Sequence, residues 1–371
     1  MVSHDTVNAA LSGKSNPESP LVDRLELLAK ENGFATTLLE VPGQSHELLI
    51  SLERTPDSPW LLFDSHLDTV SVDGMIIEPF GGKVTNGRLW GRGACDTKGT
   101  GAAMFSALAE YSKLTDGRNN IMLLFSVDEE HGMSGIREFA SIHLPALGRS
   151  VQAAIVGEPT GLEPVVAHNG VQRYIISTTG VAAHSSDPSR GRSAITDMAT
   201  LLLELESKYI PTLTASHPLT GEAQASINII RGGNAANIIP ERCEIHMDRR
   251  TVPGESPSEI VDDLKSWLAK YQSTHAGVEI TFDSEVETPP LTPVQTDVSD
   301  RIRTVLRDHG RRDELAGVRY ATNAGELSAA GIPSIVLGPG DIAQGHTKDE
   351  WLDVTELEAA VPIYRDIMNH G

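Results

Sequence analysis

Apolar and polar positions alternate in two different ways along the chain, and the first way predicts a layered α/β domain. Three short, continuous apolar runs at 60–64, 121–126 and 153–156 predict strands that helices bury on both faces. Apolar residues at helical spacing in 20–32 and an Ala-rich stretch at 98–114 predict helices between these strands. Strands and helices in this order are typical of an α/β fold, a sheet with helices packed against it.

The middle of the chain follows a different order of elements. Predicted strands and helices come in the order β-α-β-β-α-β, which is complete in itself and typical of a ferredoxin-like α+β sandwich. In chain order these six elements are expected at 171–179, 193–208, 224–230, 241–251, 256–271 and 278–283.

After Pro289 and Pro290 the α/β pattern resumes, so we predict one domain inserted into another. The predicted catalytic domain consists of residues 1–168 and 285–371, and the inserted domain of residues 169–284. Within the catalytic domain, the first dozen residues are the only candidate for disorder.

The charge and composition of the chain argue against some classes of binding partner. The formal net charge of −21 argues against nucleic acid or an anionic membrane surface, because both repel an acidic protein. The longest apolar runs are too short to span a bilayer, and no basic segment followed by an apolar one is seen near His4 and Asp5. Cys95 and Cys243 fall in different predicted domains, so we expect no disulfide and a cytoplasmic location.

Five side chains that can bind metal follow short apolar runs or lie in glycine-rich loops. Open α/β sheets place their sites at the carboxyl ends of strands, so we expect these side chains to converge. Two imidazoles and three carboxylates suit a borderline divalent ion such as zinc or cobalt. The sequence therefore predicts a metal centre formed by His66, Asp96, Glu130, Glu158 and His346.

Two further carboxylates lie beside these candidate ligands. Asp68 is two residues from His66 on an extended segment, so it points the same way and can accept the free ring N–H. Glu129 precedes Glu130 and is placed to take a proton as a general base. Burial and neighbouring carboxylates are expected to raise its pKa toward the working pH.

Each candidate also has a plainer explanation when taken alone. His66 and Asp68 could cap a turn, and Asp96 could cap the helix that follows it. Adjacent glutamates are usually solvated charges, and a lone histidine such as His346 is usually a surface residue. The joint pattern favours the metal centre, because every candidate follows a strand or lies in a glycine-rich loop.

The five motifs resemble those of the acetylornithine deacetylase and succinyl-diaminopimelate desuccinylase family of dinuclear zinc metallopeptidases. The resemblance implies a catalytic domain with a mixed sheet flanked by helices, an inserted dimerisation or lid domain, and two Zn²⁺ or Co²⁺ ions per subunit. It also implies a cis peptide bond between Asp96 and Thr97, with Asp68 and Glu129 as orienting residue and base. The implied ligand sets are His66, Asp96 and Glu158 for one ion, and Asp96, Glu130 and His346 for the other.

The resemblance extends to the inserted domain. It implies that His184 reaches across a homodimer to polarise the scissile carbonyl, and that Asn237 and Arg250 hold the substrate carboxylate. A tight turn and a strand-end salt bridge are the plainer explanations for these last two. Glu326 stands where desuccinylases are expected to carry an arginine, so it would attract an ammonium group, although it could simply begin a helix.

Several segments are most similar to acetylornithine deacetylases, so we expect removal of an acetyl group from an N-acyl amino acid such as N-acetylornithine. A water bridging the two ions would attack the amide while Glu129 accepts its proton. Alternatives are an aminoacylase, desuccinylase or dipeptidase of the same family, and a non-catalytic binder of amino-acid derivatives. A purely structural zinc protein is disfavoured, because such sites are usually rich in cysteine.

Overall fold

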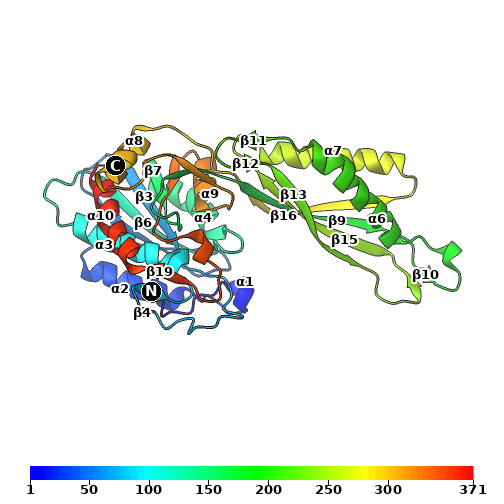
Figure 1. Ribbon diagram of the computed structural model, residues 1–371, viewed down its shortest axis with the longest axis horizontal. Coiled ribbons are helices and arrows are strands. Elements are labelled where there is room, and N and C mark those ends of the chain that lie inside the picture. The colour runs from blue at the N-terminus through cyan, green and yellow to red at the C-terminus, as the bar shows by residue number, and fades with distance from the viewer. Residues whose placement is uncertain (371) are drawn as a thin grey trace. The chain divides into compact units, whose positions relative to one another are not determined.

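The computed structural model describes residues 1–370, which divide into two compact units (Figure 1). The first unit comprises residues 1–166, 291–317 and 322–370, and the second comprises residues 167–290 and 318–321. The sequence placed the insert at 169–284. The short return of the chain at 318–321 joins the second unit because the Arg319 guanidinium lies against Gly221 of a hairpin there.

An eight-stranded mixed sheet forms the centre of the first unit. Its strands run in the order β1-β2-β6-β3-β7-β18-β8-β17, and β6, β3, β7 and β18 are parallel neighbours. The parallel strands are β3 (Trp60–His66), β6 (Asn120–Ser126), β7 (Val151–Val156) and β18 (Ser334–Val336). The outer strands are β1 (Ala35–Leu39), β2 (Glu47–Leu52), β8 (Val165–His168) and β17 (Ala316–Val318).

Helices cover both faces of this sheet, as the sequence predicted. Alternate residues of β3 face opposite ways: Leu61 and Phe63 belong to the core under four long helices, whereas Asp64 faces α9. The four are α2 (Ser19–Glu31), α3 (Gly99–Tyr111), α8 (Asp297–Asp308) and α10 (Val354–His370), and α4 (Ser134–Glu138) and α9 (Asn323–Ala329) lie on the other side (Figure 1). No helix within residues 1–370 is both long and apolar enough to cross a membrane.

In a small three-stranded sheet of the first unit, a strand near the C-terminus pairs with two strands from the N-terminal part of the chain. It has the order β19-β5-β4, and its strands are β4 (Lys83–Thr85), β5 (Arg88–Trp90) and β19 (Trp351–Asp353). Because Trp351 pairs with Trp90, the residues just outside these two strands, Glu350 and Arg92, are brought near each other.

The second unit has the predicted β-α-β-β-α-β order. Its antiparallel sheet runs β13-β15-β9-β16, and both helices pack on one face. Tyr174 and Ile176 of β9, with Ile245 and Met247 of β15, form the core under those helices. The elements are β9 (Gly170–Thr179), α6 (Ala194–Glu204), β13 (Gln224–Gly232), β15 (Arg242–Thr251), α7 (Pro257–Thr274) and β16 (Glu279–Thr288).

The first dozen residues are ordered, which corrects the expectation of disorder. Val7 forms a parallel bridge with Thr69, and the buried Thr6 hydroxyl donates to the Leu67 carbonyl at 2.6 Å. Val2 and Asn8 are also buried. The local pattern missed this because the segment is held by hydrogen bonds to residues about sixty positions away, rather than by a run of apolar side chains.

Glu18, which precedes α2, is buried among other carboxylates. It is 1% exposed, and the Ser45 hydroxyl donates to its Oε2 at 2.5 Å. Burial, together with the negative charges of Asp68 and Asp128, raises the pKa of Glu18 to about 7.

We expect Glu18→Gln to flatten the fall of stability with rising pH. The folded protein holds the Glu18 proton up to about pH 7, whereas the unfolded chain releases it near its ordinary pKa of 4.5, so wild-type stability falls as pH rises between these values. Through Glu18 alone, the free energy of unfolding of the wild type should fall by roughly 3 kcal/mol over this pH range. Urea unfolding of the metal-free protein between pH 5 and 8 measures it. Glu31→Gln, an exposed change on α2, is the control, and equal slopes for all three proteins would contradict the expectation.

Candidate metal centre

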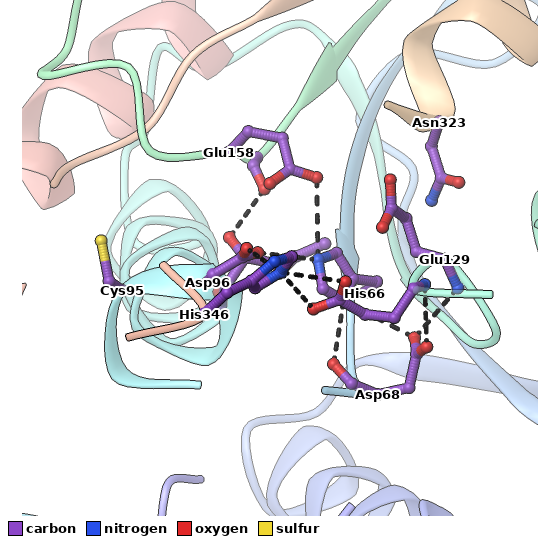
Figure 2. Close-up of polar contacts among 12 residues, drawn as sticks. His66, Asp68, Cys95, Asp96, Glu129, Glu158, Asn323 and His346 are labelled. Carbon is purple, nitrogen blue, oxygen red and sulfur yellow. Dashed lines mark hydrogen bonds and ion pairs between the residues drawn. The ribbon is translucent and has the colours of Figure 1, made fainter. Parts of the chain in front are cut away.

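His66 is the last residue of β3, and its ring is fixed in the orientation that a metal ligand needs. The ring Nδ1–H donates to the Asp68 backbone carbonyl at 3.0 Å, with the Asp68 Oδ1 at 3.5 Å. The Nε2 atom then faces the carboxylates of Asp96 and Glu158, at 3.2 and 3.7 Å (Figure 2). The closer partner of Nδ1 is thus the backbone carbonyl of Asp68, whereas the sequence led us to expect its carboxylate.

Asp96 lies between the two histidines. It belongs to the turn Ala94–Lys98 that enters α3, and the peptide bond between Asp96 and Thr97 is cis. Its Oδ1 is 3.2 Å from His66 Nε2, and its Oδ2 is 3.2 Å from His346 Nε2 (Figure 2). One carboxylate therefore offers an oxygen to each of two neighbouring positions.

Glu130 and His346 complete the second position. His346 Nε2 lies 3.1 Å from Glu130 Oε2 and 3.2 Å from Oε1. The His346 backbone has φ 60°, a left-handed conformation that is uncommon for a residue with a side chain. Its ring is half exposed, whereas His66, Asp96 and Glu158 are buried, so the second position is the more open of the two.

Donor spacing and charge both fit divalent cations. Atoms of His66, Asp96 and Glu158 lie within 4.8 Å of one another, as do those of Asp96, Glu130 and His346. Two ligands of one tetrahedral zinc ion lie about 3.3–3.4 Å apart, close to the separations found here. With Glu129 the site holds four carboxylates against two imidazoles, so if all four are ionised even protonated histidines leave it negatively charged, and a buried charge of that kind must be balanced by cations or by protons.

The pKa shifts describe the same imbalance. Burial raises the pKa of Glu158 well above its usual range, and the charge of Asp96 adds to the effect. Burial opposes the charged form of His66, yet hydrogen bonds with Asp68 and Asp96 hold its pKa well above its usual value. Hydrogen bonds with Asp96 and Glu130 raise the pKa of His346 to about 10. Metal binding must therefore displace protons from this site.

Glu129 lies beside the ligands without pairing with any of them. Its backbone N–H donates to Asp68 Oδ1 at 3.1 Å, and within residues 1–370 no group donates a hydrogen bond to its carboxylate. Burial raises the pKa of Glu129 well above its usual range; the charge of His66 opposes this, and neighbouring carboxylates reinforce it. Figure 2 shows Glu129 on the side of the cluster toward Asn323, whose amide donates to Asp64 at 2.9 Å.

The Arg92–Glu350 ion pair, which sequence reasoning missed, holds the loops of two ligands. Glu350 Oε1 accepts the backbone N–H groups of Cys95 and Asp96 at 2.9 and 3.1 Å. Its Oε2 accepts from Arg92 Nη1 at 2.6 Å, and Arg92 Nη2 donates to the Thr347 carbonyl, next to His346, at 3.2 Å. Glu350 closes the motif that begins at His346, a placement that could have marked it as a supporting carboxylate.

Close packing fixes the backbone beside Glu158. A Cβ on Gly338 would lie 2.4 Å from the Glu158 carbonyl oxygen, so only glycine fits there. The Thr97 hydroxyl also donates to the Gly157 carbonyl at 2.7 Å, which links the Asp96 turn to the end of β7. Each ligand loop is thus tied to its neighbour by the backbone as well as by the side chains.

Of the remaining candidate residues, three belong to the second unit and one to the first. In the second unit, His184 pairs with Ile238, and the Asn237 carbonyl accepts the Ser185 N–H at 3.0 Å, so His184 and Asn237 are neighbours. Arg250 lies at the far end of β15 and donates to Asp248 at 2.7 Å. In the first unit, Glu326 accepts from Arg137 Nε at 2.7 Å.

We expect Glu350→Gln to weaken both the fold and metal binding. Arg92 would be left buried without its carboxylate, and breaking such a pair typically costs about 3–5 kcal/mol. The glutamine NH₂ must face either Arg92 or the Cys95 and Asp96 N–H groups, so the ligand loops should shift and metal binding should weaken by roughly 10–100-fold. Chelator competition and urea unfolding measure the two effects. Glu358→Gln, an exposed change on α10, serves as the control, and wild-type metal affinity in Glu350→Gln would refute the supporting role.

Comparison with known proteins agrees with this geometry. The chain matches peptidase family M20/M25/M40 over residues 62–370. It resembles the structure of the M20 family metallo-carboxypeptidase Sso-CP2 from Sulfolobus solfataricus, with 17% identity and a TM-score of 0.81, covering 100% of this chain and 97% of that one. It also resembles the structure of a tripeptidase from Staphylococcus aureus subsp. aureus Mu50, with 20% identity and a TM-score of 0.77, and that match covers 99% of this chain and 95% of the other.

A third similar structure is the Bacillus subtilis YXEP protein, described as a dinuclear metal binding peptidase from the M20 family. It is 16% identical, with a TM-score of 0.72, and the match covers 99% of this chain and 95% of that one. At these identities the structures show a shared fold, and the family match, which spans most of the chain, shows the membership. The chain belongs to peptidase family M20/M25/M40 and is a metal-binding hydrolase of amide bonds.

Proposed function

We propose that this protein is a two-metal amidohydrolase, loaded with zinc or cobalt, that removes an acetyl group from an N-acyl amino acid such as N-acetylornithine. The observation that carries the proposal is the shared Asp96 carboxylate between two ligand sets, with the unpaired Glu129 carboxylate beside it. Both free cysteines are buried, which is compatible with the reducing cytoplasm in which we place the reaction.

The residues around the centre suit hydrolysis of an amide. Two divalent ions bound there would polarise the amide carbonyl and acidify a water molecule. Glu129 would take the proton of that water and return it to the leaving amine, because its carboxylate accepts no hydrogen bond from the described residues and its pKa is raised. Asp68 would hold Glu129 by its backbone N–H at 3.1 Å during both transfers.

We further propose a homodimer in which His184 and Asn237 serve the metal centre of the partner. His184 and Asn237 lie at one end of the sheet of the second unit, and Arg250 lies eight residues along β15 from Arg242, at the other end. Eight strand residues span about 26 Å. A substrate amino acid is much shorter, so if all three residues contact one substrate, they must come from two subunits.

The proposed substrate carries a cationic side chain, which we assign to Glu326. The Glu326 carboxylate is mostly buried and pairs with the more exposed Arg137, so part of its charge is already balanced. The overall charge of −21 adds a general attraction for cationic molecules. A neutral or anionic acyl amino acid would lack the ammonium group for this carboxylate.

Hydrolysis of short peptides is the second candidate. The similar structures include a tripeptidase and a metallo-carboxypeptidase, and the same two-metal chemistry cleaves a peptide bond or an acetyl amide. The two functions differ in the acyl group that must be accommodated, a difference that one or two contacts can decide.

Glu129→Gln should separate chemistry from metal binding. We expect turnover to fall by about 10²–10⁴-fold, because the amide cannot accept a proton, while metal affinity stays near wild type. Glu130→Gln should lower metal affinity instead, since Glu130 belongs to a ligand set. Steady-state kinetics and chelator competition distinguish the two, and near-normal turnover of Glu129→Gln would exclude it as the base.

Glu129→Gln also tests whether His184 serves the metal centre of the partner subunit. His184→Ala and Glu129→Gln should each be nearly inactive as homodimers. When the two variants are mixed and allowed to exchange subunits, one site of each heterodimer carries both intact residues, so up to about half of wild-type activity per heterodimer should return. Heterodimers that remain inactive would show that His184 acts within its own subunit or not at all.

A substrate panel tests the acyl group and the side chain. We expect the highest kcat/KM for N-acetylornithine among N-acetylornithine, N-acetylmethionine, succinyl-diaminopimelate and a dipeptide. Glu326→Gln should lower kcat/KM for N-acetylornithine roughly 10-fold and leave N-acetylmethionine nearly unchanged, a difference in the range of one lost specificity contact. If both substrates change equally in Glu326→Gln, the carboxylate does not select the ammonium group.

A further inference from the structure

The segment formed by residues 1–13, here called the strap, lies against the metal centre although the family match begins only at residue 62. Its backbone pairs with the chain that follows His66: the Asn8 N–H donates to the Thr69 carbonyl at 2.9 Å, and the Thr69 N–H donates to the Thr6 carbonyl at 3.0 Å. This pairing places the Asn8 side chain, which is 0% exposed, under the loop that carries Glu129 and Glu130.

Asn8 contacts two buried carboxylates with one amide group. Its Nδ2 donates to Asp68 Oδ2 at 2.9 Å and to Asp128 Oδ1 at 3.0 Å, which uses both amide hydrogens. Its Oδ1 accepts the Ala10 N–H at 2.9 Å, where Asn8 caps the short helix α1 (Ala9–Ser12). The opposite orientation of the amide would place its oxygen against two carboxylates, so the contacts fix how Asn8 is oriented.

The two carboxylates that Asn8 joins support the residues of the site. Asp68 faces the His66 ring and accepts the Glu129 and Glu130 backbone N–H groups at 3.1 and 3.0 Å. Asp128 has φ 64°, and its Oδ2 accepts the N–H and hydroxyl of Ser134 at 3.2 and 2.5 Å. The Glu129 and Glu130 N–H groups hold their loop to Asp68 directly, and Asn8 adds a side-chain link between Asp68 and Asp128 at the start of that loop.

We infer that Asn8, which the strap carries, is a positioning residue of the metal centre. By fixing Asp68 and Asp128 together, the amide sets where the Glu129 base and the Glu130 ligand lie relative to His66. The inference deepens the proposed function and rests on its two-metal centre, but it does not depend on which amide the enzyme cleaves. The strap also has a simpler possible role as a cover of the core, which the experiment separates from positioning.

The test follows binding of cobalt(II) alone to the metal-stripped full chain by visible absorption, alongside thermal unfolding. Asn8→Asp replaces the donor with an acceptor against two carboxylates, and Asn8→Ala removes the donor with little added repulsion. We expect cobalt affinity to fall about 10–100-fold in Asn8→Asp, and less in Asn8→Ala, with a changed absorption band in both. Kinetics on the best panel substrate should show the loss mainly in kcat.

Thr6→Val is the matched control within the strap. It removes an equally buried hydrogen bond, from the Thr6 hydroxyl to the Leu67 carbonyl, and leaves the Asn8 amide in place. We expect a lower unfolding temperature in Thr6→Val, with cobalt affinity and absorption like those of the wild type. A purely structural strap would instead give parallel changes in all three variants.

The outcomes separate the two claims. Wild-type cobalt affinity and spectrum in both Asn8 variants would overturn the positioning role, as would an equal cobalt defect in Thr6→Val. If cobalt binding falls only in the Asn8 variants and no panel substrate is hydrolysed by the wild type, the inference stands and the proposed function fails. A wild-type protein that binds no cobalt would contradict both the inference about Asn8 and the proposed function.

Discussion

Four carboxylates are gathered around two imidazoles in the first unit, and the protein itself supplies too little positive charge to neutralise them. Burial and this excess of negative charge together account for the raised pKa values of the carboxylates in the site. Burial raises the pKa of Glu158 and Glu129, while Asp96 stays a strong acceptor because both histidines hydrogen bond to it. A site built in this way is stable when cations are present, and its Glu129 carboxylate accepts no hydrogen bond from the described residues.

Carboxylates at this centre divide into two kinds by their hydrogen-bond donors. Those that support the site are satisfied by protein N–H groups: Glu350 by two backbone amides and Arg92, and Asp68 by two backbone amides and Asn8. Those that would bind the cations, such as Glu130 and Glu158, contact imidazole nitrogen atoms. The first kind fixes the loops, so that the second kind can be held together despite mutual repulsion.

The fold brings these groups together by an ordinary property of parallel sheets. β6, β3 and β7 are adjacent and parallel, so Glu130 and Glu158, which follow β6 and β7, meet His66, the last residue of β3, at the carboxyl end of the sheet. His346 arrives from the far end of the chain, and the pairing of β19 with β5 delivers the Glu350 carboxylate that holds its loop to Arg92. The second unit is a complete sandwich of its own, which explains why it can interrupt the first without breaking its core.

The sequence by itself determined the elements with strong periodicity and the residue types at the ends of the buried strands. Runs such as 121–126 and the β-α-β-β-α-β order are local signals, because burial on a sheet or helix face depends on spacing of a few residues. Short strands such as β4, β5 and β19 escaped prediction, since three residues carry too little pattern. Only the tertiary structure decided that Glu326 pairs with Arg137, that Glu350 pairs with Arg92, and that Asn8 reaches Asp68. These contacts join residues 60 to 258 positions apart, and a hydrogen bond over such a separation depends on how whole elements pack, which no local pattern encodes.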